Sequence, residues 1–144
     1  MESKAHHTLV KYIYNYVSNI SNIKKELIES DIFEVNGNVT RMTEGFVPDV
    51  YYNYGNMCII GEAKTEEDLE REHSINQYKS YIAHVEKKIC NGSKAIIIVA
   101  VPWAASITAY KIFKKVIGNN LGIKLIVLNE LGVYKEYEKN SIEQ

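Results

Sequence analysis

The chain has 144 residues, of which 46% are hydrophobic and 24% charged, and its formal net charge is −1 at pH 7. This length and balance suit one globular domain with its own core, and the charge argues against a strongly basic nucleic-acid binder. No apolar run reaches the roughly 18 residues of a membrane span and no signal-peptide pattern opens the chain, so we expect a cytoplasmic protein with no membrane partner.

The N-terminal region has apolar residues at helical spacing. This pattern predicts a first helix over residues 5 to 29. Ser-Asn pairs at 18–19 and 21–22 could break that helix into two pieces, because Ser and Asn side chains compete for backbone hydrogen bonds.

The next segments alternate turn signals with strand patterns. Asn36-Gly37 predicts a hairpin turn between two short strands. Residues 48–64 predict two further strands, joined by a turn at Gly55-Asn56. A long helical pattern follows over residues 66–90, and Thr65 is a candidate N-cap for it.

The C-terminal part combines fully apolar runs with one amphipathic segment. Residues 94–101 and 123–129 predict strands that are covered on both faces, and residues 103–117 predict a helix between them. We expect residues 135–144 to be a frayed tail. The whole order predicts an α/β domain with a mixed sheet flanked by helices, ending in a parallel strand–helix–strand crossover.

One group of charged residues lies at the ends of the two strands predicted between residues 48 and 64. Side chains alternate along a strand, so Glu62 and Lys64 share a face and Ala63 points away from it. A tight hairpin brings Asp49 beside Glu62, and two adjacent carboxylates repel unless a cation lies between them. A hard divalent ion such as Mg²⁺ takes oxygen ligands and would relieve this repulsion.

These residues resemble a known family. Pro48-Asp49 followed by Glu62-Ala63-Lys64 looks like the signature of the PD-(D/E)XK nucleases, the restriction-endonuclease-like superfamily. Gln77 and Tyr81 match the Gln-x-x-x-Tyr motif of its RecB-like and lambda-exonuclease-like branch. The resemblance covers roughly residues 40 to 100 and implies a mixed sheet in αβββαβ order, to which this chain would add one helix and one strand.

The resemblance also implies the chemistry. The protein would be a Mg²⁺-dependent deoxyribonuclease, with Mn²⁺ as a substitute, that hydrolyses phosphodiester bonds with a metal-activated water. The catalytic residues carried over are Asp49, Glu62, Lys64, Gln77 and Tyr81, with the metal held by Asp49, Glu62 and the backbone carbonyl of Ala63. Some members use an acidic residue of the first helix, for which Glu26 is the candidate and Glu29 and Glu44 are alternatives.

The predicted helix over residues 66–90 carries a second pattern. His73, Gln77, Tyr81, His84 and Lys88 follow one another at three- or four-residue spacing, so they form a polar and aromatic line. Such a line suits contact with phosphates and bases. We therefore predict substrate contacts by His73, Gln77, Tyr81 and Lys88, and leave His84 as a hydrogen-bonded residue.

Several of these residues have simpler interpretations. Glu62 and Lys64 could form a surface ion pair of small energetic value, and Asp49 could only cap the turn after Pro48. Tyr81 could be an ordinary core residue.

Other charged residues also leave alternatives open. His6 and His7 are adjacent on a helix and point about 100° apart, so we interpret them as surface residues and not as ligands. Lys111, Lys114 and Lys115 form either a phosphate-binding patch or, more simply, a solvated helix face.

The sequence thus favours a DNA nuclease whose specificity comes from a homodimer or from a partner protein. The alternative is a catalytically silent nucleic-acid-binding or interaction module of the same fold. A third interpretation, an unrelated α/β interaction protein, predicts that the Asp49 and Glu62 carboxylates lie far apart.

Overall fold

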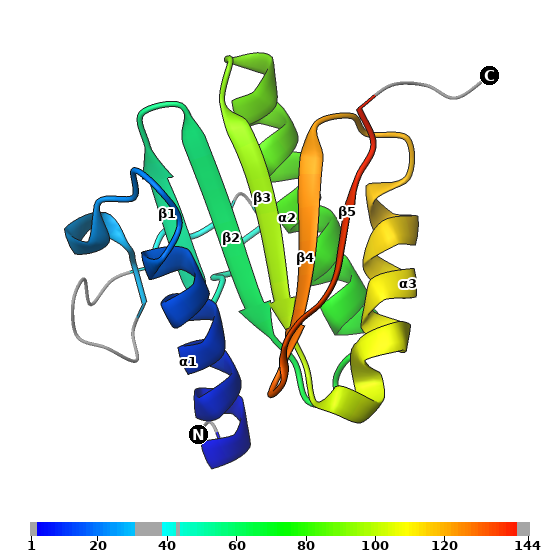
Figure 1. Ribbon diagram of the computed structural model, residues 1–144. Helices are drawn as coiled ribbons and strands as arrows, with labels where there is room; N and C mark the ends of the chain where they lie inside the picture. Colours follow the sequence, from blue (N-terminus) through cyan, green and yellow to red (C-terminus); the bar gives the residue numbers. More distant parts are fainter. Residues whose placement is uncertain (1–2, 31–38, 43, 141–144) are drawn as a thin grey trace.

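The computed structural model describes residues 3–30, 39–42 and 44–140, which contain one five-stranded mixed sheet with helices on both faces (Figure 1). The strands are β1 (Val50–Tyr54), β2 (Met57–Ala63), β3 (Lys94–Ala100), β4 (Ile123–Asn129) and β5 (Gly132–Glu138). Their order across the sheet is their order along the chain. The prediction of an α/β fold with a mixed sheet flanked by helices is confirmed.

The strand directions follow the sequence pattern. β1 and β2 form the predicted antiparallel hairpin, and Gly55 adopts the left-handed conformation that its turn requires, with φ of 61°. The apolar strands β3 and β4 are parallel neighbours in the sheet. The helix α3 (Ser106–Ile117) connects them along the chain, as predicted for a crossover. β2 and β3 are also parallel neighbours, and α2 (Glu72–Cys90) connects them along the chain.

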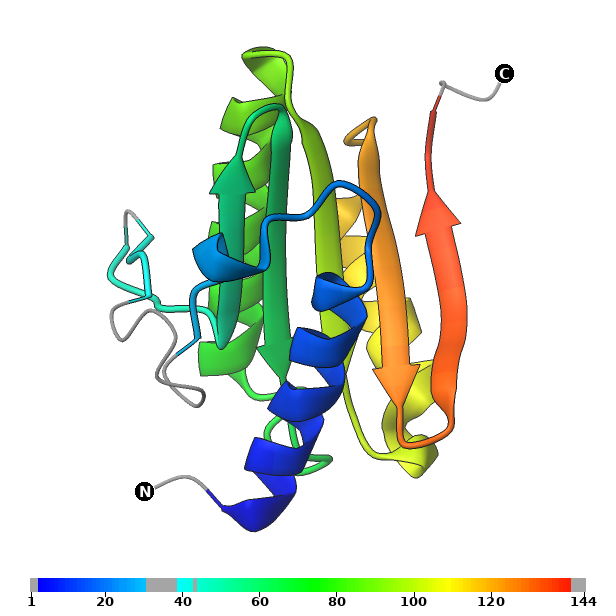
Figure 2. The same cartoon turned by 60° about the vertical axis from the view of Figure 1, so that its left-hand side comes forward.

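One face of the sheet is covered by α1 (Lys4–Ser18), as Figure 2 shows. α1 can pack closely because β2 has Gly61 beneath it. A Cβ atom at Gly61 would lie 2.5 Å from Cγ2 of Ile13, which is closer than packed carbon atoms approach. The absence of a side chain at Gly61 therefore sets how near α1 lies to the sheet.

The opposite face is covered by α2 and α3, which also contact each other. Their buried aromatic side chains meet over the sheet, and the rings of Tyr78 and Phe113 lie 4.3 Å apart between centroids. The sheet therefore has an apolar core on each face, as continuous apolar strands require.

The predicted first helix is too long. α1 ends at Ser18, Asn22 has a positive φ of 68°, and a short 3₁₀ helix, η1 (Lys25–Leu27), follows. The break lies at the Ser-Asn pairs, and Asn19 bonds its side-chain amide back to the carbonyl of Asn15. The prediction that these pairs split the segment is confirmed.

The start of the second helix also differs from the prediction. α2 begins at Glu72, and residues 66–70 form turns. Thr65 is not the N-cap, because that position is held by Arg71; the Thr65 hydroxyl donates instead to Asp68 at 3.2 Å. Leu69 is buried in these turns and its carbonyl accepts a 2.9 Å hydrogen bond from the Tyr78 hydroxyl. Burial of Leu69 thus holds the chain away from a helical path.

The predicted frayed tail was wrong for its first residues, because β5 continues to Glu138. A two-residue turn after Asn129 returns the chain along β4, and the Asn129 side chain accepts a hydrogen bond from the Leu131 amide at 2.7 Å. The Asn36-Gly37 hairpin lies outside the described residues. Among the helices that the structure describes, none has the length and apolar character needed to cross a membrane.

Candidate active site

The two predicted carboxylates lie at the edge of the sheet where β1 begins and β2 ends. The hairpin pairs Val50 with Gly61, so the next position in the same register sets Asp49 opposite Glu62. Lys64 continues β2 beyond its last residue, since its amide donates to the Ala100 carbonyl of β3 at 3.0 Å. The strand-end location that the sequence predicted is therefore correct.

The predicted alternation along β2 is also confirmed. Nζ of Lys64 lies 3.5 Å from Oε2 of Glu62, on the face covered by α2. Ala63 packs into the core on the opposite face, under α1. The pleat of one strand thus separates the charged pair from the apolar residue between them.

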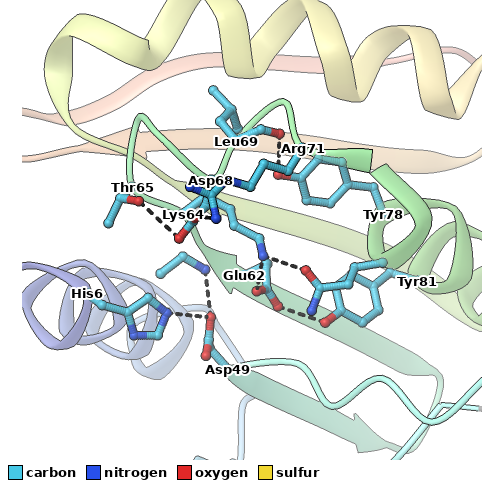
Figure 3. Close-up of polar contacts among 12 residues, drawn as sticks. His6, Asp49, Glu62, Lys64, Thr65, Asp68, Leu69, Arg71, Tyr78 and Tyr81 are labelled. Atoms are coloured by element: carbon cyan, nitrogen blue, oxygen red, sulfur yellow. Dashed lines mark hydrogen bonds and ion pairs between the residues drawn. The ribbon is translucent and has the colours of Figure 1, made fainter. Parts of the chain in front are cut away.

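Both residues of the Gln-x-x-x-Tyr motif reach this pair from α2, and Figure 3 shows the contact of Tyr81 with Glu62. The Tyr81 hydroxyl donates to Oε1 of Glu62 at 2.8 Å, and Nζ of Lys64 donates to Oε1 of Gln77. Glu62 is only 5% exposed. Each of its two carboxylate oxygens nevertheless has a polar neighbour, the Tyr81 hydroxyl or the Lys64 ammonium. One helical turn separates Gln77 from Tyr81, which lets the two side chains address Lys64 and Glu62 together.

Asp49 is held by two other elements. Its Oδ2 accepts a 2.9 Å hydrogen bond from the Ala63 amide and lies 3.3 Å from Nε2 of His6, in the first turn of α1 (Figure 3). The carboxylate therefore connects α1 to the end of β2. Interpreting His6 as a surface residue was wrong.

A sequence signal for His6 did exist. Leu9, Val10 and Ile13 follow His6 at three, four and seven residues and are all buried, so His6 begins the inward stripe of α1. His7, one residue later, is exposed.

The charge of Asp49 acts on the buried Glu62 carboxyl. Burial, and then the negative charge of Asp49, raise the pKa of Glu62 well above its usual range, while Lys64, Tyr81 and His6 act in the opposite direction. Burial, and then the charge of Glu62, also raise the pKa of Tyr81, so this phenol remains a hydrogen-bond donor. The hairpin register, which sets Asp49 opposite Glu62, argues against the interpretation with distant carboxylates.

Among the contacts of the described residues, none links the predicted substrate-binding residues His73 and Lys88 to the two carboxylates. His73 is exposed and its ring packs against Phe46, with 5.4 Å between centroids. Lys88 lies about 10 Å farther along α2 than Tyr81. Its charge, after burial, lowers the pKa of His84, whose Nε2 lies 2.8 Å from the Tyr51 hydroxyl.

The predicted acidic residue of the first helix is not on α1, which contains no Asp or Glu. Glu26 lies in η1, and its metal role stays a prediction. The two alternatives have other partners, because Glu29 accepts hydrogen bonds from Thr40 at 2.7 and 2.9 Å. Glu44 accepts one from Ser80 at 3.2 Å.

The donor set suits a hard divalent cation. Across the described residues, no three His, Cys, Asp or Glu side chains are arranged to hold a metal. Mg²⁺ does not need three, because it is commonly bound by one or two carboxylates and keeps several waters. Asp49 and Glu62 are neighbouring carboxylates at one strand end, and the Ala63 amide donates to Asp49. These residues fit Mg²⁺.

Comparison of the chain with models of protein families, with curated proteins and with solved structures gave no match.

Proposed function

We propose that this protein is a Mg²⁺-dependent nuclease of the restriction-endonuclease-like fold that hydrolyses phosphodiester bonds of DNA. The supporting observation is the convergence of Asp49, Glu62 and Lys64 at the end of β2, where burial, and then the charge of Asp49, raise the pKa of Glu62. A buried carboxylate beside a second, partly buried carboxylate is costly unless a cation joins them. Divalent-metal binding supplies a reason for this arrangement.

Asp49, Glu62 and the Ala63 carbonyl would hold the metal ion. When bound, Mg²⁺ supplies Lewis-acid polarisation of a phosphate and of a water. The chain's own contribution is orientation, since the Ala63 amide and His6 hold the Asp49 carboxylate and Tyr81 holds Glu62. Each carboxylate thus has a fixed direction before any ligand arrives.

Lys64 provides positive charge at the same place. Its ammonium is held by Gln77 and lies 3.5 Å from Glu62, so its position does not depend on substrate. In the proposed reaction this ammonium stabilises the negative charge that develops on the attacked phosphate.

A second candidate, the catalytically silent nucleic-acid-binding module of the same fold, is favoured by a specific observation. Oε1 of Glu62 has the Tyr81 hydroxyl and Oε2 has the Lys64 ammonium, so the carboxylate is satisfied by protein groups alone. Such a network can serve structure without any metal.

The test is cleavage of supercoiled plasmid and of single-stranded DNA, with Mg²⁺ and with EDTA. We expect Mg²⁺-dependent cleavage that is lost in Asp49→Ala and Lys64→Ala and retained in His7→Ala, a control on the exposed side of α1. Undiminished cleavage by both site variants would contradict this assignment. DNA binding by the wild-type protein without cleavage under any divalent ion would favour the silent module.

A further inference from the structure

A positively charged surface lies on α3, with Lys135 of β5 beside it. α3 contains Lys111, Lys114 and Lys115 and no acidic residue, although the chain as a whole has a net charge of −1. All three lysines are exposed, and Lys135 of β5 is exposed beside them. β5 also carries Glu136 and Glu138, and Glu136 pairs with Lys124 of β4 at 3.1 Å, so the excess of positive charge lies on α3 and at Lys135.

The rings of Tyr110 and Tyr137 contact two of these lysines, Lys114 and Lys135. Nζ of Lys114 lies 4.9 Å from the ring centre of Tyr137 and 5.8 Å from that of Tyr110. Nζ of Lys135 lies 4.9 Å from the Tyr110 ring centre, and the two rings meet edge to face at 6.3 Å. We name these four side chains the lysine–tyrosine cluster. Cation–π contacts hold its ammonium groups in place, whereas lysines of an ordinary solvated face are free to spread.

An exposed tryptophan lies at the start of the same helix. Trp103 is the only tryptophan of the chain and is 63% exposed, in the 3₁₀ turn η2 (Trp103–Ala105). It lines a shallow hollow of about 310 Å³ together with Ala104, Ser106, Ile107 and Tyr134. A large exposed aromatic beside other apolar side chains is a frequent mark of a binding site.

The tryptophan connects the cluster to the candidate active site. Ile107 precedes Tyr110 by about one helical turn, and Tyr134 adjoins Lys135 in β5. At the other end, Trp103 follows β3 by three residues, and the last residue of β3 accepts the backbone hydrogen bond of Lys64. η2 and the end of β2 lie at the same end of the molecule (Figure 1). The surface along α3 therefore begins at the same end of the molecule as the candidate site.

We infer that this surface, from Trp103 to the lysine–tyrosine cluster, binds a single-stranded segment of the nucleic acid. An unpaired base stacks on Trp103, and the phosphates that follow contact the lysines. Base stacking on aromatic side chains combined with a cationic path is the usual mode of single-strand binding. A duplex would offer phosphates but no free base face. The inference rests on the proposed function, since it names the substrate that the nuclease would receive.

Because Trp103 is the only tryptophan, its fluorescence reports directly on the inferred contact. The wild-type protein is titrated in EDTA with a single-stranded oligonucleotide, with the matching duplex and with polyglutamate. We expect quenching by the single strand alone. Binding of the single strand, seen by anisotropy of a labelled oligonucleotide, without quenching would overturn the inference. Equal quenching by the duplex or by polyglutamate would also overturn it.

The lysines are tested with a charge-matched pair of double variants. Lys114→Gln/Lys135→Gln removes the cluster, and Lys11→Gln/Lys25→Gln removes two exposed lysines of α1 and η1. We expect the cluster variant to bind about 10-fold more weakly and its salt slope to fall by about 1.4, since each single-strand phosphate contact contributes about 0.7. The control variant should change binding less than about 2-fold. Equal losses in both variants would contradict a specific contact.

Binding in EDTA does not depend on cleavage, so the two proposals can fail separately. Quenching and cluster-dependent binding without Mg²⁺-dependent cleavage would remove the proposed function and leave this surface as a binding site. Mg²⁺-dependent cleavage with an unquenched Trp103 would remove only the present inference.

Discussion

The hydroxyl of Tyr81 lies 2.8 Å from Oε1 of Glu62, and this hydrogen bond joins the middle of α2 to the end of β2. Lys64 lies beside the other carboxylate oxygen, so Glu62 is oriented from a helix and from its own strand at once. The geometry of the candidate metal-binding carboxylate therefore depends on how α2 packs against the sheet.

Tyr81→Phe should weaken the site and the fold together. The substitution keeps the buried ring and removes the donor, which leaves Oε1 of the buried Glu62 without its hydrogen bond. Losing a partner of a buried polar group costs about 1–3 kcal/mol of unfolding free energy. Urea unfolding measures this loss, and isothermal titration with Mg²⁺ should show weaker binding than wild type.

Tyr78→Phe is the matched control, because Tyr78 is equally buried and its hydroxyl donates to the Leu69 carbonyl instead. It should lose a similar amount of stability and keep wild-type Mg²⁺ affinity. Equal weakening of Mg²⁺ binding in both variants would mean that the Tyr81 bond has no specific role.

Glu62→Gln should change how stability depends on pH. Burial and Asp49 raise the folded-state pKa of Glu62 above that of the unfolded chain, so the folded state holds the proton more tightly. The resulting stability is fully present below the unfolded pKa and is lost as pH rises through the folded pKa. Between those two values, the wild type should lose about 1.4 kcal/mol per pH unit relative to the Gln variant.

The measurement is chemical unfolding of both proteins in EDTA over a pH series. Parallel pH profiles for the two proteins would show that the Glu62 pKa is not raised. Addition of Mg²⁺ should stabilise the wild type more than the variant at neutral pH, because only the wild type offers both carboxylates.

Gly61→Ala should destabilise the protein through contact with α1. The new Cβ atom would lie 2.5 Å from Ile13 Cγ2 and 3.2 Å from Val50 Cβ. Overpacking of this kind costs about 1–3 kcal/mol. Thermal or urea unfolding measures the loss.

A double-mutant cycle with Ile13→Ala identifies the cause. Truncating Ile13 to Ala alone costs about 2–5 kcal/mol, and the double variant should lose less than the sum of the two single variants. Simple additivity would show that Gly61 is required for another reason.

His6→Ala should affect metal binding more than folding. Asp49 keeps its bond from the Ala63 amide, so the fold changes little, while the orientation that His6 gives to Asp49 is lost. Loss of a residue that orients a metal ligand costs about 10- to 100-fold in metal affinity or activity. Mg²⁺ titration of His6→Ala and of the exposed neighbour variant His7→Ala tests this, and matching affinities would contradict it.

The sheet was largely predictable because its strands have strong local signals. Short local patterns predict these elements: continuous apolar runs predict β3 and β4, and the glycine at position 55 predicts the turn. The Glu62 and Lys64 geometry was predictable for the same reason, since alternation along a strand needs no tertiary information.

Other features depend on contacts that no local pattern contains. β5 was not predicted, because an exposed edge strand has no buried face and so lacks alternating hydrophobicity. The turns before α2 are tied to the helix by the bond between Tyr78 and Leu69, nine residues apart. The approach of His6 to Asp49 joins the first turn of α1 to the hairpin, a separation in sequence that only the packed fold closes.

The strand order has a consequence for the folding pathway. Every neighbouring pair of strands is consecutive along the chain, so the sheet with α2 and α3 can form through hairpins and single-helix crossovers. α1 is the exception, because it comes first in the chain and packs on β2, β3 and β4. We expect α1 to dock last, since its contacts close the longest loops. His6 reaches Asp49 only when α1 docks, so the candidate site would be completed in the final step of folding.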